Sequence, residues 1–267
     1  MLIHWNFDPI LFSLGPIQAR WYGILFVGGF FVGQWILGRM FASEGVPKER
    51  AERLLLILLL GAIIGARLVH CLFYDPHYYL AHPLDILKVW EGGLASHGGA
   101  LGMLIALWIA QRKMNPPLPY LWLVDRVAVT TALGAVFIRT ANFLNSEIIG
   151  KPTSGSWGVV FERVDALPRH PVQLYEAVSY LVIFIVLMAL YVRKRAATPH
   201  GLLFGWFMVL VFVARFILEF FKAPQAAYEA NQLISVGQYL SIPFIALGAY
   251  MIWRSGRRQQ SGIELAS

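Results

Sequence analysis

Long apolar blocks alternate with short polar connections along almost the whole chain. A bilayer core requires about 20 apolar residues per helix, and seven blocks of the chain approach that length. The pattern therefore predicts an all-α, polytopic membrane protein with seven transmembrane helices. The predicted spans are 21–41, 52–74, 95–111, 120–141, 176–192, 201–221 and 236–253.

The connections between these blocks carry turn and charge signals. Proline, glycine and charged residues gather in EGVPKER, YDPHYYLAHPLD, QRKMNPPLP, RKRAATPH and KAPQAAYEANQ, and the longest polar stretch is 142–175. The polar positions thus mark where each predicted helix ends.

Composition strengthens the membrane interpretation. Hydrophobic residues make up 58% of the 267 residues and charged residues only 14%, whereas a soluble domain carries about 25% charged residues. We expect one integral-membrane domain over residues 1–267. The N-terminal stretch MLIHWNFDPILFSLGP lacks the basic start and cleavage site of a signal peptide. The sole cysteine, Cys71, excludes a disulfide or a cysteine metal cluster within one chain.

The basic residues are distributed unevenly between the two sides. One set of alternate connections carries 12 of the 22 lysines and arginines, the other set carries 6, and 4 lie inside predicted spans. The positive-inside rule places the richer set in the cytoplasm. We therefore expect the N-terminus outside and the C-terminus inside, with the loop around His97, the stretch 142–175 and the KAPQAAYEANQ loop facing outside.

Four arginines fall inside the predicted spans, where a charge is costly and is a candidate for function. Arg67 shares a helical face with His70 and Tyr74, which suits a tether to a backbone carbonyl or a headgroup. Arg126, next to Asp125, is interpreted as architectural. The other two carry the stronger functional signal. Arg139 opens the polar run RTANFLNSEIIGKP, in which the spacing places Asn142 on its side of the helix, with Asn145 as a further candidate. Arg215 and Glu219 are four residues apart on one face and can pair, either for function or as a structural pair that holds helices together.

Glycine spacing adds a prediction about packing. Pairs of glycines four residues apart let two helices approach closely. These pairs are Gly29 and Gly33, Gly61 and Gly65, and Gly98 and Gly102.

The stretch EGGLASHGGALG, residues 91–102, places His97 among five glycines at the start of an apolar block. A guanidinium offers a rigid fork of donors that suits a phosphate, and a phosphate at membrane depth suits a phospholipid headgroup. Histidine can take up a proton near neutral pH. The residues alone suggest an outward-facing lipid-phosphate site, and they leave His97 open as either a base or a hydrogen-bonded strut.

Several blocks together resemble the phosphatidylglycerol–prolipoprotein diacylglyceryl transferases of bacteria. The blocks are GPIQARWYG, EGGLASHGGALG, RTANFLNSEIIGKP, LPRHPVQLYEA and ARFILEFFKAP, in the family's order, and the resemblance runs from about residue 8 to residue 253. It implies transfer of the diacylglyceryl group of phosphatidylglycerol to the lipobox cysteine of a preprolipoprotein. A thioether forms and glycerol phosphate leaves.

The resemblance also implies the site residues. His97 matches the family's essential histidine, Arg139 its headgroup-binding arginine, and Arg215 the arginine of the sixth span; these are the expected catalytic residues. The expected substrate-binding residues are Tyr22, Gly98, Gly99, Arg139, Asn142, Glu147, Gly150, Gln173, Tyr175, Glu176, Arg215 and Glu219.

The resemblance implies a bacterial inner-membrane, multi-pass enzyme whose site faces the periplasmic leaflet. We expect phosphatidylglycerol, a lipobox signal peptide and membrane lipids as partners, a monomer, and no nucleic acid, cofactor or metal. Departures at Arg20, His70 and Val211 affect the fine contacts. A paralogue with fewer acceptor proteins, a membrane transporter and a lipid-binding scaffold remain as alternatives.

Overall fold

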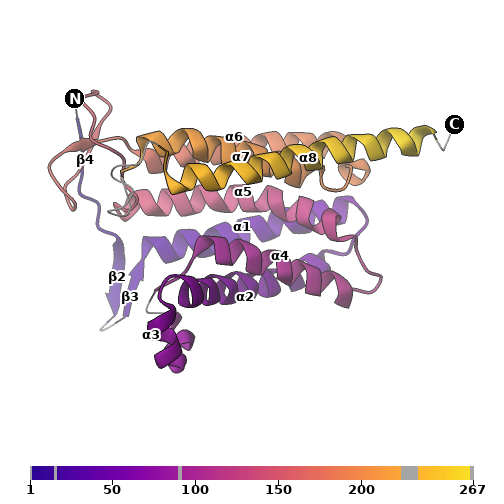
Figure 1. Cartoon of the computed structure of the whole chain (residues 1–267), viewed down its shortest axis with the longest axis horizontal. Helices are drawn as coiled ribbons and strands as arrows, with labels where there is room; N and C mark the ends of the chain where they lie inside the picture. The colour runs from indigo at the N-terminus through magenta and orange to yellow at the C-terminus, as the bar shows by residue number, and fades with distance from the viewer. Residues whose placement is uncertain (1, 15–16, 90–91, 224–233, 265–267) are drawn as a thin grey trace. The chain divides into compact units, whose positions relative to one another are not determined.

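The computed structural model describes residues 2–14, 17–89, 92–223 and 234–264 (Figure 1). Within them, each predicted apolar block forms a helix, so the helical fold is confirmed. The long helices are α1 (Trp21–Ser43), α2 (Lys48–Phe73), α4 (Ser96–Lys113), α5 (Tyr120–Leu144), α6 (Val172–Lys194), α7 (Leu202–Leu218) and α8 (Val236–Glu264).

Six helices of the described part of the chain are long and apolar enough to cross a membrane: α1, α2, α5, α6, α7 and α8. The third predicted span, α4, is not among them. It has 18 residues, begins with Ser96 and His97 and ends with Arg112 and Lys113, so its apolar stretch is short. The structure therefore establishes a helical membrane fold, and the count of seven spans and the orientation stay predictions.

Short elements that the sequence pattern did not predict also occur. Strand β1 (Ile3–Trp5) pairs in parallel with β4 (Val159–Phe161), which pairs antiparallel with β5 (Pro168–Arg169). Strands β2 (Ile10–Leu14) and β3 (Ile17–Arg20) form an antiparallel pair. Strands of two to five residues are too short to give a clear period of two. The short helices are α3 (Pro76–Ala81), η1 (Pro83–Leu87), η3 (Arg195–Ala197) and η4 (Glu219–Phe221).

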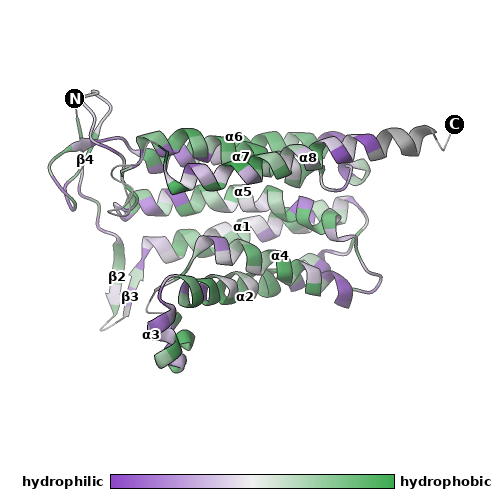
Figure 2. Cartoon of the chain, viewed as in Figure 1, coloured by the Kyte–Doolittle hydropathy of each residue, from purple (hydrophilic) through white to green (hydrophobic). Residues whose placement is uncertain are grey.

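The chain divides into two compact units whose boundaries fall inside α1 and α5: residues 1–36 with 127–267, and residues 37–126. The first unit contains α6, α7 and α8, with α7 packed between its two neighbours (Figure 1). Figure 2 shows α6, α7 and the first part of α8 as largely hydrophobic, and α8 as hydrophilic toward its C-terminal end. A small apolar core of Phe143, Val159 and Phe161, with Trp5 packed on it, joins the short strands to the end of α5.

The second unit is built on the contact between α2 and α4. A Cβ atom added to Gly65 would collide with the carbonyl of Gly98, and one added to Gly102 with the carbonyl of Gly61. The two helices touch backbone to backbone, as the glycine spacing predicted. A larger residue at Gly65 or Gly102 would therefore force the helices apart.

Candidate functional site

The first unit holds a charged cluster where α5, α6 and η4 come together. Arg139 Nε lies 2.9 Å from Glu176 Oε2, and Lys222 Nζ lies 2.8 Å from Glu176 Oε1. The Glu176 side chain is 1% exposed. Both contacts are ion pairs. Their angles do not meet the geometry of a hydrogen bond to either oxygen of the Glu176 carboxylate. A buried carboxylate is stable here because it is held between two cations.

Arg139 also anchors a chain of polar side chains along the end of α5. Arg139 Nη1 donates to Asn142 Oδ1 at 3.2 Å, and Asn142 Nδ2 donates to Glu147 Oε2 at 3.1 Å. Gln173 Nε2, from α6, donates to the backbone carbonyl of Glu147 at 2.6 Å. The spacing argument that placed Asn142 on the side of Arg139 is confirmed, and four of the predicted site residues lie in one network.

Glu147 sits in a turn with unusual backbone geometry. Its neighbours Ser146 and Ile148 have φ angles of 55° and 53°, in the left-handed region that a β-branched residue such as Ile148 rarely adopts. Residues in this region cost of order 1–3 kcal/mol each and cluster at functional sites. The turn points the Glu147 carboxylate back toward Asn142.

Gly150 and Tyr175 lie at the edge of the same network. Gly150 forms a backbone bridge with Lys222, and a Cβ atom added to it would lie 2.7 Å from the Cβ atom of His170. Tyr175 places its hydroxyl 3.3 Å from His170 Nδ1. A side chain at position 150 would displace His170. This close packing is sufficient to explain why position 150 is a glycine, whether or not a ligand also binds there.

Tyr180 lies on α6 one helical turn after Glu176, and its side chain is 5% exposed. The charges of Glu176, Arg139 and Arg215 act on its phenol. The phenol of Tyr22, on α1, is close enough to Glu147 and Arg139 for both charges to act on it. The cluster thus extends from α5 and α6 to α7 and the start of α1.

Glu219 is oriented differently from the predicted pairing with Arg215. Among the described residues its ion pair is with Lys222, at 3.4 Å between Oε2 and Nζ. A Cβ atom on Gly237 would lie 2.9 Å from Glu219 Oε1, so the carboxylate also faces the first turn of α8. A negative charge is favoured at a helix N-terminus. The backbone of Glu219 keeps helical angles and its N–H donates to the carbonyl of Arg215, so the carboxylate pairs with Lys222 although its backbone stays in helical register with Arg215.

His97 belongs to the second unit and lies in the first turn of α4 rather than in the preceding loop. Its side chain is exposed, whereas the adjacent Gly98 and Gly99 are buried. A Cβ atom on Gly98 would lie 2.6 Å from Val69 Cβ. The structure gives these glycines a packing role against α2, and their predicted contact with substrate stays a prediction.

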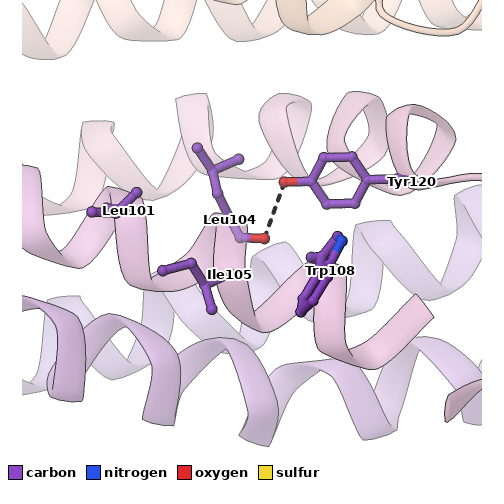
Figure 3. Close-up of a pocket in the computed structure, with 5 residues that line it drawn as sticks. All are labelled: Leu101, Leu104, Ile105, Trp108 and Tyr120. Atoms are coloured by element: carbon purple, nitrogen blue, oxygen red, sulfur yellow. Dashed lines mark hydrogen bonds between the residues drawn. The ribbon is translucent and has the colours of Figure 1, made fainter. Parts of the chain in front are cut away.

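The face of α4 that carries His97 continues as a shallow apolar groove. Leu101, Leu104, Ile105 and Trp108 of α4 line it together with Tyr120, and its volume is about 360 Å³ (Figure 3). Figure 3 shows the Tyr120 hydroxyl donating to the carbonyl of Leu104, at 3.0 Å. Residues three and four apart share a helix face, so His97 stands at one end of this apolar strip.

The two arginines that lie inside predicted spans of the second unit have structural partners. Arg126, fully buried, donates to both carboxylate oxygens of Glu44 at 3.0 and 2.7 Å, which agrees with its architectural interpretation. Arg67 donates to backbone carbonyls, as the tether interpretation predicted. The ring of His70 stacks on that of Tyr74 with centroids 5.5 Å apart.

Two members of the charged cluster were missed by the sequence interpretation. Lys222 was counted only as a loop cation, although it lies three residues after Glu219 in the block ARFILEFFKAP. Tyr180 follows Glu176 by one helical turn, and that spacing was the available signal. From the sequence alone, neither Lys222 nor Tyr180 could be distinguished from polar residues that have no role in the cluster.

These observations define a class: a helical membrane protein in which a buried, charged cluster joins the ends of several helices. The family model for prolipoprotein diacylglyceryl transferase matches residues 9–254. The chain belongs to this family and is a transferase.

Similar proteins cover nearly the whole chain. A phosphatidylglycerol–prolipoprotein diacylglyceryl transferase of Tolumonas auensis is 55% identical over 97% of this chain and 99% of its own length. Proteins of the same name from Chloroherpeton thalassium and Bacteroides fragilis are 48% and 42% identical, over 97% and 96% of this chain and 96% of their own length in both cases.

Proposed function

We propose that this chain transfers the diacylglyceryl group of phosphatidylglycerol to the lipobox cysteine thiol of a preprolipoprotein, the first step of bacterial lipoprotein maturation. The observation that carries the proposal is the 55% identity, over 97% of the chain, to a transferase of that name. The charged cluster around Arg139 supports it on chemical grounds, because a phospholipid headgroup carries a phosphate.

The reaction is a substitution at the glycerol carbon that bears the phosphate ester. The acceptor thiol loses its proton, because the thiolate is the nucleophile, and His97 is the base that takes it. The C–S bond forms as the C–O bond to phosphate breaks, and the electron pair leaves with glycerol phosphate. The thiol belongs to the substrate, so Cys71, which is buried, has no part in the chemistry.

Arg139 and Arg215 stabilise the charge that develops on the departing phosphate. A guanidinium carries five N–H donors, so the contacts of Arg139 with Glu176 and Asn142 leave donors for an anion. Donors that are already oriented cost no reorganisation when the charge develops. Tyr22, Asn142 and Glu147 hold the glycerol headgroup, and Glu176 and Glu219 hold the cations in place.

The predicted topology fits this role. With α4 counted as a seventh span, the N-terminus lies outside and the C-terminus inside, and the site faces the periplasmic leaflet of the inner membrane, where exported preprolipoproteins arrive. The enzyme acts as a monomer on phosphatidylglycerol and a lipobox signal peptide. The KAPQAAYEANQ loop, predicted to face the same side, lies mostly outside the described residues.

A transporter or a lipid-binding scaffold would bind the phospholipid without cleaving it. The test is turnover: purified protein in detergent is mixed with phosphatidylglycerol and a synthetic lipobox peptide. The account predicts release of glycerol phosphate and a peptide heavier by one diacylglyceryl group, with neither product from a peptide in which serine replaces the lipobox cysteine. If the protein binds the lipid but neither product forms, the proposed transferase function is wrong and the protein is a lipid-binding protein.

A further inference from the structure

Arg67 makes an unusual set of contacts near the outer end of α2. Its side chain is 3% exposed, and its guanidinium donates to backbone carbonyls rather than ending at a headgroup. Nε donates to Ile86 O at 2.9 Å, Nη2 to Asp85 O at 2.5 Å, and Nη1 to Gly92 O at 2.6 Å. The Tyr79 ring lies 5.1 Å from the guanidinium carbon.

These contacts join two separate segments through one side chain. The carbonyls of Asp85 and Ile86 belong to η1, and that of Gly92 belongs to the glycine segment that precedes α4. Gly92 and Gly93 have φ angles of 90° and 69°, which glycine adopts at no steric cost. The segment can therefore turn its carbonyls toward Arg67, with a longer contact of 3.4 Å to Gly93 O.

The same end of α2 fixes the backbone on both sides of His97. Ala95 N donates to the carbonyl of Ala66, the residue before Arg67, at 3.0 Å. On the other side, Gly98 packs directly against Gly65. His97 is thus carried by backbone that is attached to α2 before and after it, and Arg67 supplies the attachment of the segment leading into it.

We propose that Arg67 is a positioning residue for His97: it clamps the glycine segment and η1 together and so sets where the imidazole stands at the start of α4. The inference rests on the proposed function, in which His97 is the base. Lysine cannot replace this clamp, because an ammonium lacks the planar fork that reaches carbonyls in two segments at once.

A misplaced base lowers the rate of the chemical step more than it lowers substrate binding. A displacement of about 1 Å costs about 100-fold in rate. We therefore expect Arg67→Lys and Arg67→Met to lower kcat for peptide modification by about 100-fold, with an unchanged KM for phosphatidylglycerol.

A matched control exists on the same helix. Arg50, near the other end of α2, also donates to two backbone carbonyls, Pro116 O at 3.0 Å and Asn115 O at 2.5 Å, but this clamp is far along the sequence from the glycine segment. Arg50→Met removes two arginine-to-carbonyl hydrogen bonds at a more exposed position, and we expect it to leave kcat unchanged.

The experiment measures kcat, KM and backbone deuterium uptake of residues 92–100 for the full-length protein in detergent. Support requires lower kcat and faster uptake in this segment for both Arg67 variants, with Arg50→Met like the wild type. Wild-type kcat in folded Arg67 variants, or a lower kcat with unchanged uptake, overturns the proposal.

A second variant covers the case in which the Arg67 variants do not fold. A Cβ atom on Gly93 would lie 2.8 Å from Arg67 Nη1 and 2.6 Å from His70 Nε2, so Gly93→Ala disturbs the clamp from the other side. Reduced kcat with faster uptake then supports the proposal, and unchanged kcat overturns it. His97→Ala is the reference: if it stays active, the role of His97 as base is wrong, whereas an inactive His97→Ala beside active Arg67 variants rejects only this inference.

Discussion

Arg139 Nε lies 2.9 Å from the Oε2 atom of Glu176, a carboxylate that is 1% exposed. The pair means that Arg139, the arginine proposed to bind the headgroup, is held by a partner of opposite charge before any anion arrives. The other oxygen of the same carboxylate faces Lys222, so Glu176 carries one negative charge between two positive ones. Lys222 also pairs with Glu219, so these two cations are matched by two carboxylates, and an incoming phosphate would meet the N–H donors that Arg139 has left over.

Glu176→Gln removes this negative charge while keeping the shape of the side chain. Breaking a buried ion pair by removing one partner costs about 3–5 kcal/mol, because the other charge is left unpaired. We expect a clearly lower Tm in a thermal-shift assay and a loss of transferase activity. The control is Glu162→Gln, an exposed carboxylate paired with His4, which should change neither quantity.

A double variant separates charge balance from packing in the same cluster. Glu176→Gln with Lys222→Met removes one charge of each sign, so the two substitutions should be non-additive, as expected for contacting residues. The double variant should melt higher than Glu176→Gln alone. If the two losses of stability simply add, the ion pair between these residues does not contribute to the fold.

For Arg126, the buried arginine of the second unit, we expect a loss of stability without a loss of activity, in contrast to the Glu176 variant. Arg126 pairs with Glu44, and Trp122 Nε1 donates to the same carboxylate at 2.9 Å. Glu44→Gln should lower the Tm through the same unpaired-charge cost of about 3–5 kcal/mol. The kcat of the folded protein should stay at the wild-type value, measured below the Tm, because this cluster is architectural. A large fall in kcat would show that the pair takes part in the reaction.

Acid should weaken one link between the short strands and the site. Hydrogen bonds from Arg169 lower the pKa of Asp165 below its ordinary value, and Arg169 Nη1 also donates to the carbonyl of Gly150 at 3.1 Å. A carboxyl with a lowered pKa stabilises the fold above its unfolded pKa of about 3.9, and the contribution disappears as the pH falls through the folded value.

Asp165→Asn tests this relationship. Its Tm should be lower than that of the wild type at pH 7, and the difference should close as the pH falls below about 4. A series of thermal melts of both proteins from neutral pH downward measures it. A difference that is constant over the whole range would mean that the charge of Asp165 is not what stabilises the segment.

Much of the helical architecture follows from the sequence because a membrane span must be a helix of about 20 mainly apolar residues, in which every backbone N–H and C=O group is hydrogen-bonded within the helix. Each predicted block forms a helix, and the ends lie within a few residues of the prediction except at the C-terminal end of α8, which continues to Glu264 instead of residue 253. The glycines of α2 and α4 meet as their spacing indicated. The polar run after Arg139 placed Asn142 correctly, since both lie on one continuous helix.

The cluster was predictable only where its members share an element. Lys222, the residue after η4, reaches Glu176, a contact between segments 46 positions apart in the numbering, and no local pattern encodes it. Glu219 was assigned to Arg215 from helical spacing, and its backbone does stay in helical register with Arg215, but its carboxylate pairs with Lys222. The short strands escaped detection because each is only a few residues long, and β1 in addition pairs with a distant partner, β4.

The most direct test compares diacylglyceryl transfer by the wild type, His97→Ala and Arg139→Ala on a lipobox peptide with phosphatidylglycerol in detergent. The account predicts that both variants remain folded and that transfer falls by at least about 100-fold in each, the scale seen when a general base or an oxyanion-stabilising donor is removed. Near-normal transfer in both folded variants would contradict the claim that an imidazole and a partly buried guanidinium carry the reaction.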